Sequence, residues 1–205
     1  VLVRWAQRHR GPVAMLAAAL IAILVATLMV LPRRPTVVSV GTTGVATGIT
    51  VACYMLLLQT LHGNLYSQIP LLLMSLALGI VAGSYGIVFL AARYGPSFPA
   101  TVRQHSDFFI GTFVLLTIAG FSLAPAPGAW VFAIALLLMG MLVAFQFTTE
   151  TESENVRYAA DMLGGVFGMV LGITVLVPLA GTLPTAVGLC AAKLAAWLVK
   201  PHSAG

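Results

Sequence analysis

Long apolar runs separated by short polar segments dominate the pattern of this chain. A helix of about 20 residues crosses the hydrocarbon core of a bilayer, and each run is close to that length. None of the runs alternates apolar and polar residues, as the strands of a transmembrane barrel do. The pattern therefore predicts an all-α, polytopic transmembrane helical bundle with about seven spans, at 12–31, 41–61, 70–92, 108–123, 130–147, 158–179 and 183–199.

The two ends of the chain and the fourth run are the least regular parts of this pattern. We read the apolar run at 12–31 as a first span, because it is too long for a signal peptide and no cleavage site follows. We expect residues 1–40 to form a basic N-terminal segment plus this helix, and 41–205 to form a six-helix membrane domain. The chain does not begin with Met, which we take to indicate a start inside a longer product. Pro178, Gly181 and Pro184 leave only a tight turn before the last run, so we expect a tilted or partly inserted seventh helix.

Composition excludes a soluble domain. Charged residues make up 7% of the chain and hydrophobic residues 60%, which leaves too little polar surface for solubility in water. The net charge of +5 does not indicate a nucleic-acid partner, because the basic residues flank the apolar runs. Cys53 and Cys190 both lie inside apolar runs, which favours buried free thiols over a disulfide.

Arginines divide the connections into two sets. The loops after the first, third and fifth runs contain Lys or Arg, whereas those after the second, fourth and sixth contain none. By the positive-inside rule the first set faces the cytoplasm, and the C-terminus with Lys200 lies on the same side. Seven spans then place the N-terminus, which is also basic, outside, and this conflict stays open. We expect a bacterial inner membrane protein with a cytoplasmic C-terminus.

Small residues recur every four positions in three of the runs. This spacing lines them up along one side of a helix, where another backbone can approach closely. We interpret them as packing faces of the bundle, with a sliding interface for alternating access as the other reading. The residues are Gly44, Gly48, Ala52, Gly79, Gly83, Gly164, Gly168 and Gly172.

Candidate chemistry inside the runs is sparse. Asp161 is the one acidic residue within them, and Arg157 lies four positions earlier on the same helix face. We expect an interfacial salt bridge in which Arg157 snorkels, with a proton- or cation-binding carboxylate as the alternative. Beyond Asp161 we count as midplane polar groups little more than Thr50, Thr117 and Thr174.

A second polar group surrounds the loop after the second run. Gln59, His62 and Tyr66, with Tyr54, Asn64 and Gln68, are typical of interfacial anchors, and the alternative is a shallow pocket for a quinone head group. We expect no intrinsic cofactor: no pair of facing histidines indicates haem, no His/Cys spacing indicates zinc, and no glycine-rich phosphate loop occurs.

Two stretches resemble a known family. One carries Gln59, Gly63 and Tyr66 followed by a helix that closes in Leu78-Gly79-x-x-x-Gly83-Ser84, and the other carries Tyr158, Asp161, Gly164, Gly168, Pro178 and Gly181. These motifs resemble the membrane region of bacterial proteins in which a helical bundle is fused to a spermidine-synthase-like domain. Met162 and Val177 depart from the family pattern. The synthase-like domain itself is absent from this sequence, so we expect no aminopropyl transfer and no enzyme activity.

The resemblance implies a membrane half that works beside a soluble domain. Our leading functional prediction is a non-catalytic membrane subunit that anchors or scaffolds a partner protein or soluble domain at the extracytoplasmic face. The alternatives are a transporter of a small cationic or apolar solute, since the family is loosely similar to facilitator-type carriers, and a quinone-presenting subunit of an electron-transfer complex.

Overall fold

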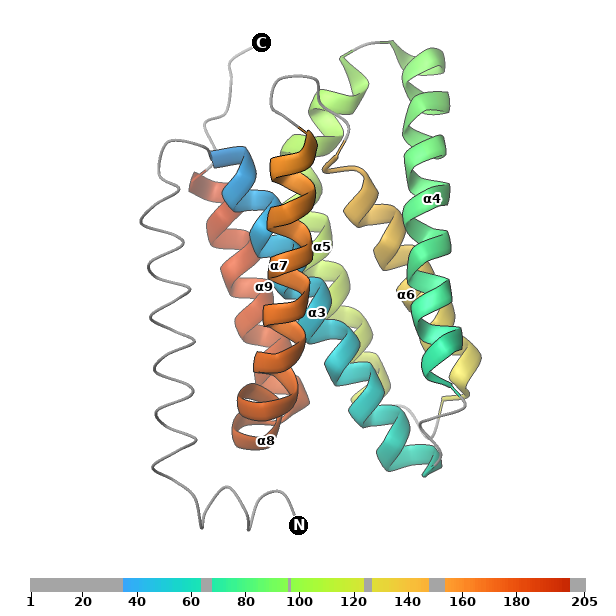
Figure 1. Cartoon of the computed structure of the whole chain (residues 1–205), viewed down its shortest axis with the longest axis vertical. Coiled ribbons are helices and arrows are strands. Elements are labelled where there is room, and N and C mark those ends of the chain that lie inside the picture. Colours follow the sequence, from blue (N-terminus) through green and yellow to red (C-terminus); the bar gives the residue numbers. More distant parts are fainter. Residues whose placement is uncertain (1–34, 64–67, 96, 124–126, 148–153, 200–205) are drawn as a thin grey trace.

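The chain folds into an all-helical bundle. The computed structural model describes residues 35–63, 68–95, 97–123, 127–147 and 154–199, and the expected first span at 12–31 lies outside them. Within the described residues there are no strands and six main helices (Figure 1). They are α3 (Pro35–His62), α4 (Ile69–Tyr94), α5 (Phe98–Leu123), α6 (Ala129–Ala144), α7 (Glu154–Leu171) and α9 (Thr182–Val199).

Four helical segments are long and apolar enough to cross a membrane. They cover Ser39–His62, Ile69–Tyr94, Gln104–Leu123 and Arg157–Ala180. The helices α6 and α9 are apolar but shorter, at 16 and 18 residues, which corresponds to about 24 and 27 Å of rise. The predicted class of an all-α protein with membrane-type helices is therefore confirmed.

The fourth predicted run was too short at its N-terminal end. The sequence pattern placed its start at 108, but α5 begins at Phe98 and spans 26 residues. The apolar run breaks before Phe108 because Gln104, Ser106 and Asp107 are polar, yet the helix continues through them. Ser106 and Asp107 are buried among partner helices, where their hydrogen bonds replace those of water.

The hairpin before the last helix is as tight as expected. α7 continues through a π-helical turn, η1 (Gly172–Leu176), into the short α8 (Val177–Ala180). Pro178 has no backbone N–H to give to an α-helical bond, which accounts for the irregular turn that precedes it. Gly181 then adopts φ 90° and donates its N–H to the carbonyl of Val177 at 2.9 Å, and α9 starts at the next residue.

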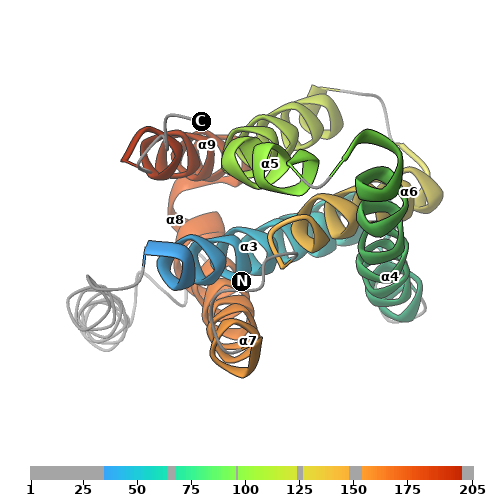
Figure 2. The same cartoon turned by 90° about the horizontal axis from the view of Figure 1, so that it is seen from above.

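The six helices form two inverted units of three. The closest pairs are α3 with α7, α4 with α6, and α5 with α9. Exchanging α3, α4 and α5 with α6, α7 and α9 maps this set of pairs onto itself. The direction of the chain reverses between the units, since α3 and α6 start at opposite ends of the bundle (Figure 1). Viewed from above, α3 and α6 lie between the α5/α9 pair and the helices α4 and α7 (Figure 2).

Glycines lie where paired helices approach most closely. A Cβ added at Gly48 would lie 2.1 Å from the carbonyl oxygen of Gly165, and one at Gly168 would lie 2.2 Å from that of Val45. Gly44, Gly164 and Gly172 also face the partner helix within the α3/α7 pair. In the α4/α6 pair the close contacts are made by Gly79, Gly83 and Gly140.

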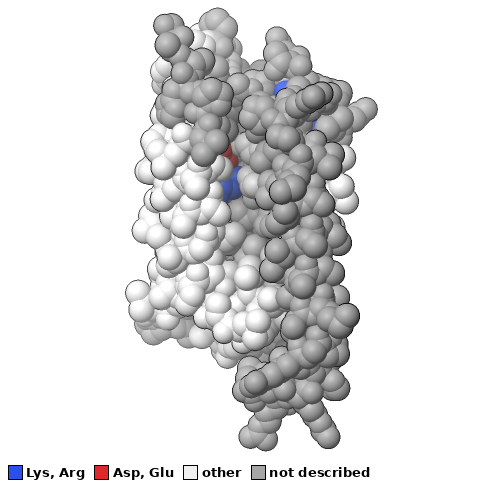
Figure 3. Space-filling view, turned by 90° about the vertical axis from the view of Figure 1, so that its left-hand side faces the viewer, with Lys and Arg blue, Asp and Glu red and all other residues white. Residues whose placement is uncertain are grey.

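The distribution of polarity is inverted relative to a soluble protein. Large apolar side chains lie exposed along α4 and α7, including Val88, Phe89, Leu163 and Val166, whereas Asp107, Arg157 and Lys193 are buried. The described part of the face in Figure 3 is mostly uncharged, with a small acidic and basic patch and small basic areas near the top. Such a surface matches hydrocarbon as a solvent, in which apolar side chains incur no exposure cost.

The close approach of α3 and α7 yields a stability prediction. Gly48→Ala inserts a methyl group where no space exists, so we expect a loss of about 1–3 kcal/mol and a lower unfolding midpoint in mild detergent. Gly120→Ala in α5 is the matched control, because nothing lies within 4 Å of an added Cβ there. Alanine also favours helix, so this control should hold or raise the midpoint. Equal midpoints for the two variants would contradict the packing.

Candidate functional site

A buried ion pair lies inside the bundle. The ammonium nitrogen of Lys193 on α9 lies 2.8 Å from the Oδ1 atom of Asp107 on α5, and the two side chains are 2% and 0% exposed. At roughly 1.5 Å per residue, Asp107 lies about 14 Å from the start of α5 and Lys193 about 9 Å from the end of α9. Both ends belong to the side of the bundle with the arginine-containing loops.

Side chains from two further helices complete the surroundings of Asp107. Its Oδ2 atom accepts a hydrogen bond from the hydroxyl of Ser39 on α3 at 2.9 Å. Its Oδ1 atom also accepts from the side-chain amide of Gln146, just beyond α6, at 3.0 Å. The same amide lies 3.0 Å from the Ser106 hydroxyl. One carboxylate thus connects α3, α5, α9 and the C-terminal end of α6.

The N-terminal half of α3 supplies the other neighbours of Lys193. Its ammonium nitrogen donates to the hydroxyls of Thr42 and Thr43, and lies 3.3 Å from the carbonyl oxygen of Ser39. Thr43 also donates to the Gln146 side-chain oxygen, so the hydrogen bonds of the network form a closed ring. The ammonium is therefore surrounded by oxygen atoms, and the lysine side chain is almost fully buried.

A third charged group lies near the pair. The Asp161 carboxyl on α7 interacts electrostatically with Lys193. The backbone carbonyl of Asp161 faces Gly44, where an added Cβ would lie 2.2 Å from it, so α7 packs closely on α3 at this residue. Lys193 thus lies between a carboxylate that it contacts and a second one within electrostatic range.

α3 presents two chemically different faces. Ser39, Thr43, Thr50 and Tyr54 fall within an arc of about 60° at 100° per residue, and all four are buried. The glycines that pack on α7 occupy the opposite side of the helix. The hydroxyl face turns toward the ion pair near one end of α3, so a line of hydroxyl groups runs from the charged cluster toward the other end.

An aromatic cluster lies at the far end of this hydroxyl face. Tyr54 donates its phenol hydrogen to Thr117 on α5, and its ring packs edge-on against Phe121 and Phe132 at centroid distances of 5.3 and 5.5 Å. The two phenylalanine rings lie 4.4 Å apart. The helices α3, α5 and α6 are therefore joined by charges near one end and by aromatic rings near the other.

The sequence-based site residues fall into separate places. Arg157 is 2% exposed, so its side chain lies inside the bundle, and the salt bridge expected between it and Asp161 stays a prediction. Gln59 and His62 are exposed at the end of α3, and Tyr66 lies outside the described residues. Tyr54 is buried in the core and does not belong to that surface group.

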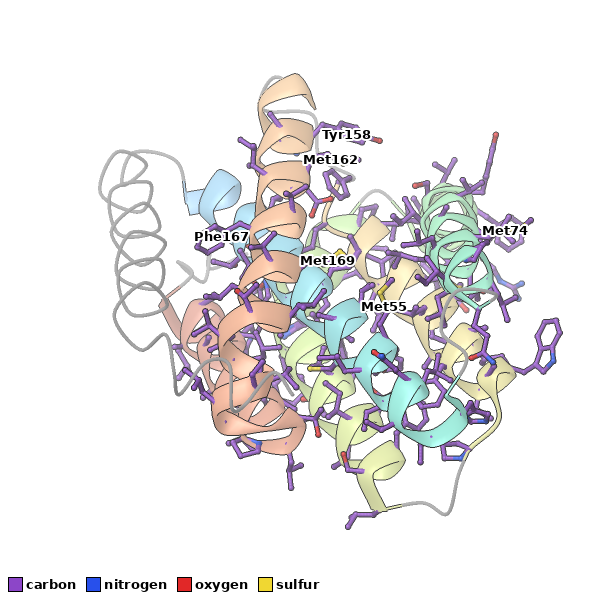
Figure 4. All side chains as sticks on the ribbon, turned by 60° about the horizontal axis from the view of Figure 1, so that its bottom comes forward. Met55, Met74, Tyr158, Met162, Phe167 and Met169 are labelled. Carbon is purple, nitrogen blue, oxygen red and sulfur yellow. The ribbon has the colours of Figure 1, made fainter. Side chains whose placement is uncertain are left out.

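Tyr158 lies at the surface of α7. It is half exposed, and its ring stacks on Phe147 with the centroids 5.2 Å apart. Figure 4 shows Tyr158 and Met162 projecting from the same part of α7. We therefore assign Tyr158 a packing role between α7 and the end of α6.

Sequence reasoning missed both members of the ion pair. Asp107 fell one residue outside the run at 108–123, and Lys193 was a single base among small residues at 183–199. The hydroxyl spacing at Ser39, Thr43, Thr50 and Tyr54 was the available signal, because it marks a polar face on a helix that is otherwise apolar.

Neither the arrangement of possible metal ligands nor the comparisons with known proteins assign a function to the site. Within the described residues, no group of three or more His, Cys, Asp or Glu side chains is arranged to hold a metal ion. No family model, curated protein or solved structure matched the chain. The chemistry of the site is therefore argued from the charged network alone.

A double-mutant cycle tests the network. Lys193→Met leaves a buried carboxylate without its ammonium, and Asp107→Asn leaves a buried ammonium without its carboxylate, so each should cost about 3–5 kcal/mol. The double variant D107N/K193M removes both charges and keeps the shapes, and we expect it to be more stable than either single variant. Unfolding midpoints in detergent give the comparison, with exposed Arg93→Met as a near-neutral control. Additive losses would show that the two charges do not interact.

Proposed function

We propose that the chain is a multi-pass membrane transporter of a small cation, and that the Asp107 carboxylate holds the cation inside the bundle. The observation that carries the proposal is the buried Asp107–Lys193 pair in a bundle whose exterior is apolar. Ionisable groups within membrane helices are costly, face the bundle interior, and mark ion and substrate pathways.

The membrane setting is part of the proposal. Seven spans packed through four-residue glycine spacings would include the first run at 12–31 together with the shorter α6 and α9. The helix ends with Arg93 and Arg103 would face the cytoplasm of a bacterial cell, together with the C-terminus. The charged cluster would then lie toward the cytoplasmic side of the inner membrane.

The architecture supports transport over a static role. Inverted repeats of transmembrane helices are typical of secondary transporters, in which substrate sites lie where the repeats meet. Here the helices that surround the ion pair come from both three-helix units. In this proposal the charged network near one end, and the packed rings of Tyr54, Phe121 and Phe132 near the other, would be the two barriers that alternating access has to open.

Stability alone is a weak reason for a buried ion pair. Desolvation of two charges offsets most of their attraction, and apolar residues of similar volume often serve a fold equally well. A purely structural pair would be replaceable by neutral side chains without loss of function. A cation site needs the carboxylate itself, and this difference separates the two interpretations.

The other predicted roles make less use of the geometry. Anchoring of a soluble domain, which the family resemblance implies, stays a prediction that copurification of the complex in mild detergent tests. It involves none of the buried charges. Quinone presentation relied on the interfacial aromatic and histidine group, and Tyr54 does not belong to that surface.

Uptake into proteoliposomes tests the transport proposal. The purified chain is reconstituted with an inside-negative potential, and accumulation of radiolabelled methylammonium, putrescine, tetraethylammonium and tetraphenylphosphonium is measured. We expect at least one cation to accumulate above protein-free vesicles, and D107N/K193M to abolish that uptake while remaining folded. Arg93→Met, at an exposed position in the last turn of α4, should retain it.

Two results would count against transport. Absence of uptake for every cation in the panel would contradict the proposal for this chain. Uptake that persists in D107N/K193M would show that the pair has a purely structural role.

A further inference from the structure

The oxygen atoms around the Lys193 ammonium belong to other helices. Asp107 Oδ1 comes from α5, and the Thr42 hydroxyl, the Thr43 hydroxyl and the Ser39 carbonyl come from α3. None of these four acceptors belongs to α9, which carries Lys193. The oxygen cage, as we call these four atoms, is therefore a feature of α3 and α5 that the lysine side chain enters from outside.

The cage matches a primary ammonium group in its hydrogen-bond pattern. An alkylammonium has three N–H donors and no acceptor, and four acceptors converge here on one nitrogen. The hydroxyl hydrogens have other acceptors: that of Thr42 points to the Ser39 carbonyl and that of Thr43 to the Gln146 side-chain oxygen. Both hydroxyl oxygens can therefore accept from the cation, which selects a group that only donates.

The Asp107 carboxylate keeps its own support without the lysine. The Ser39 hydroxyl and the Gln146 amide both donate to it. Hydrogen bonds of this kind favour the charged form and hold its orientation. The cage thus presents a fixed negative charge beside neutral acceptors, which is the arrangement that an incoming ammonium requires.

Lys193 also has neighbours outside the cage, on α7 and α5. Asp161 on α7 lies within electrostatic range of the same ammonium. Gly111 on α5 faces the Lys193 Cβ, where an added Cβ would lie 2.9 Å away, so the stem of the side chain passes close to the α5 backbone.

We propose that the oxygen cage is a binding site for the primary ammonium group of a small cationic solute, and that Lys193 fills it as a built-in competitor. This inference rests on the proposed transport function, since the solute is the transported cation. Exchange of Lys193 for the solute ammonium at Asp107 would conserve the charge of the site. The cage would then stay occupied throughout the transport cycle, either by the lysine or by the solute.

Chemical rescue tests the site without transport. Lys193→Ala removes the competitor and leaves every acceptor of the cage in place. Methylammonium, ethylammonium and n-propylammonium chloride are titrated into this variant in detergent, with tetramethylammonium and sodium chloride at equal ionic strength as controls. We expect a saturating rise in unfolding midpoint of about 3–6 °C at tenfold excess over Kd, largest for propylammonium, which also fills part of the vacated stem.

Matched variants assign the effect to the cage. The double variant D107N/K193A should show no rescue, and Lys193→Ala should respond to neither tetramethylammonium, which has no N–H donor, nor sodium. The unsubstituted chain should not respond at millimolar concentrations, because Lys193 holds the site. Equal stabilisation by all the cations, or rescue that survives D107N, would overturn the proposal.

Folding of the variant is itself informative. If Lys193→Ala is recovered only as aggregate, it is purified with propylammonium or with tetramethylammonium throughout. Monodisperse protein in propylammonium alone supports the site, and aggregate in both overturns it. Rescue without any uptake in vesicles would leave the ammonium site standing and remove the transport role. Uptake without rescue would leave the transport role standing and remove the ammonium site.

Discussion

A charge taken out of water must meet its counter-charge, and this constraint organises the interior of the bundle. Asp107 and Lys193 are both almost fully enclosed, and each depends on the other across the α5/α9 pair. An unpaired charge in such a place costs several kcal/mol, so the two helices have to meet in one register. Ser39, Thr43 and Gln146 satisfy the remaining hydrogen bonds and extend this requirement to α3 and the end of α6.

Glycine makes the arrangement possible in a solvent that offers no hydrophobic drive between helices. The α3 helix packs on α7 through Gly44 and Gly48, which leaves its opposite face free to carry hydroxyl groups toward the charges. Gly111 allows a similarly close approach to α5, at the position where the stem of Lys193 passes. The same helices thus pack closely through one side and contribute to the buried polar network through the other.

The sequence predicted the helical class well, because runs such as 70–92 are continuous and apolar. It also identified the four-residue glycine spacings. It could not predict which helices pair, since spacing along one helix says nothing about its partner. Asp107 was missed because its polar neighbours made the apolar run start one residue later, at 108. Lys193 was missed because a single base among alanines resembles a helix end. Their relationship appears only once α5 and α9 lie side by side.

The central claim is that the Lys193 ammonium touches the Asp107 carboxylate within a lipid bilayer. Solid-state NMR of the reconstituted chain, with ¹⁵N in the lysine side chain and ¹³C in the aspartate carboxyl, measures this contact by dipolar recoupling. The two lysines are distinguished by Lys200→Arg, and the two aspartates by Asp161→Asn. The account predicts a nitrogen-to-carboxyl-carbon distance under about 4 Å, as a direct charge-assisted hydrogen bond requires. Absence of dephasing for Lys193, together with rapid exchange of its ammonium protons with water, would contradict it.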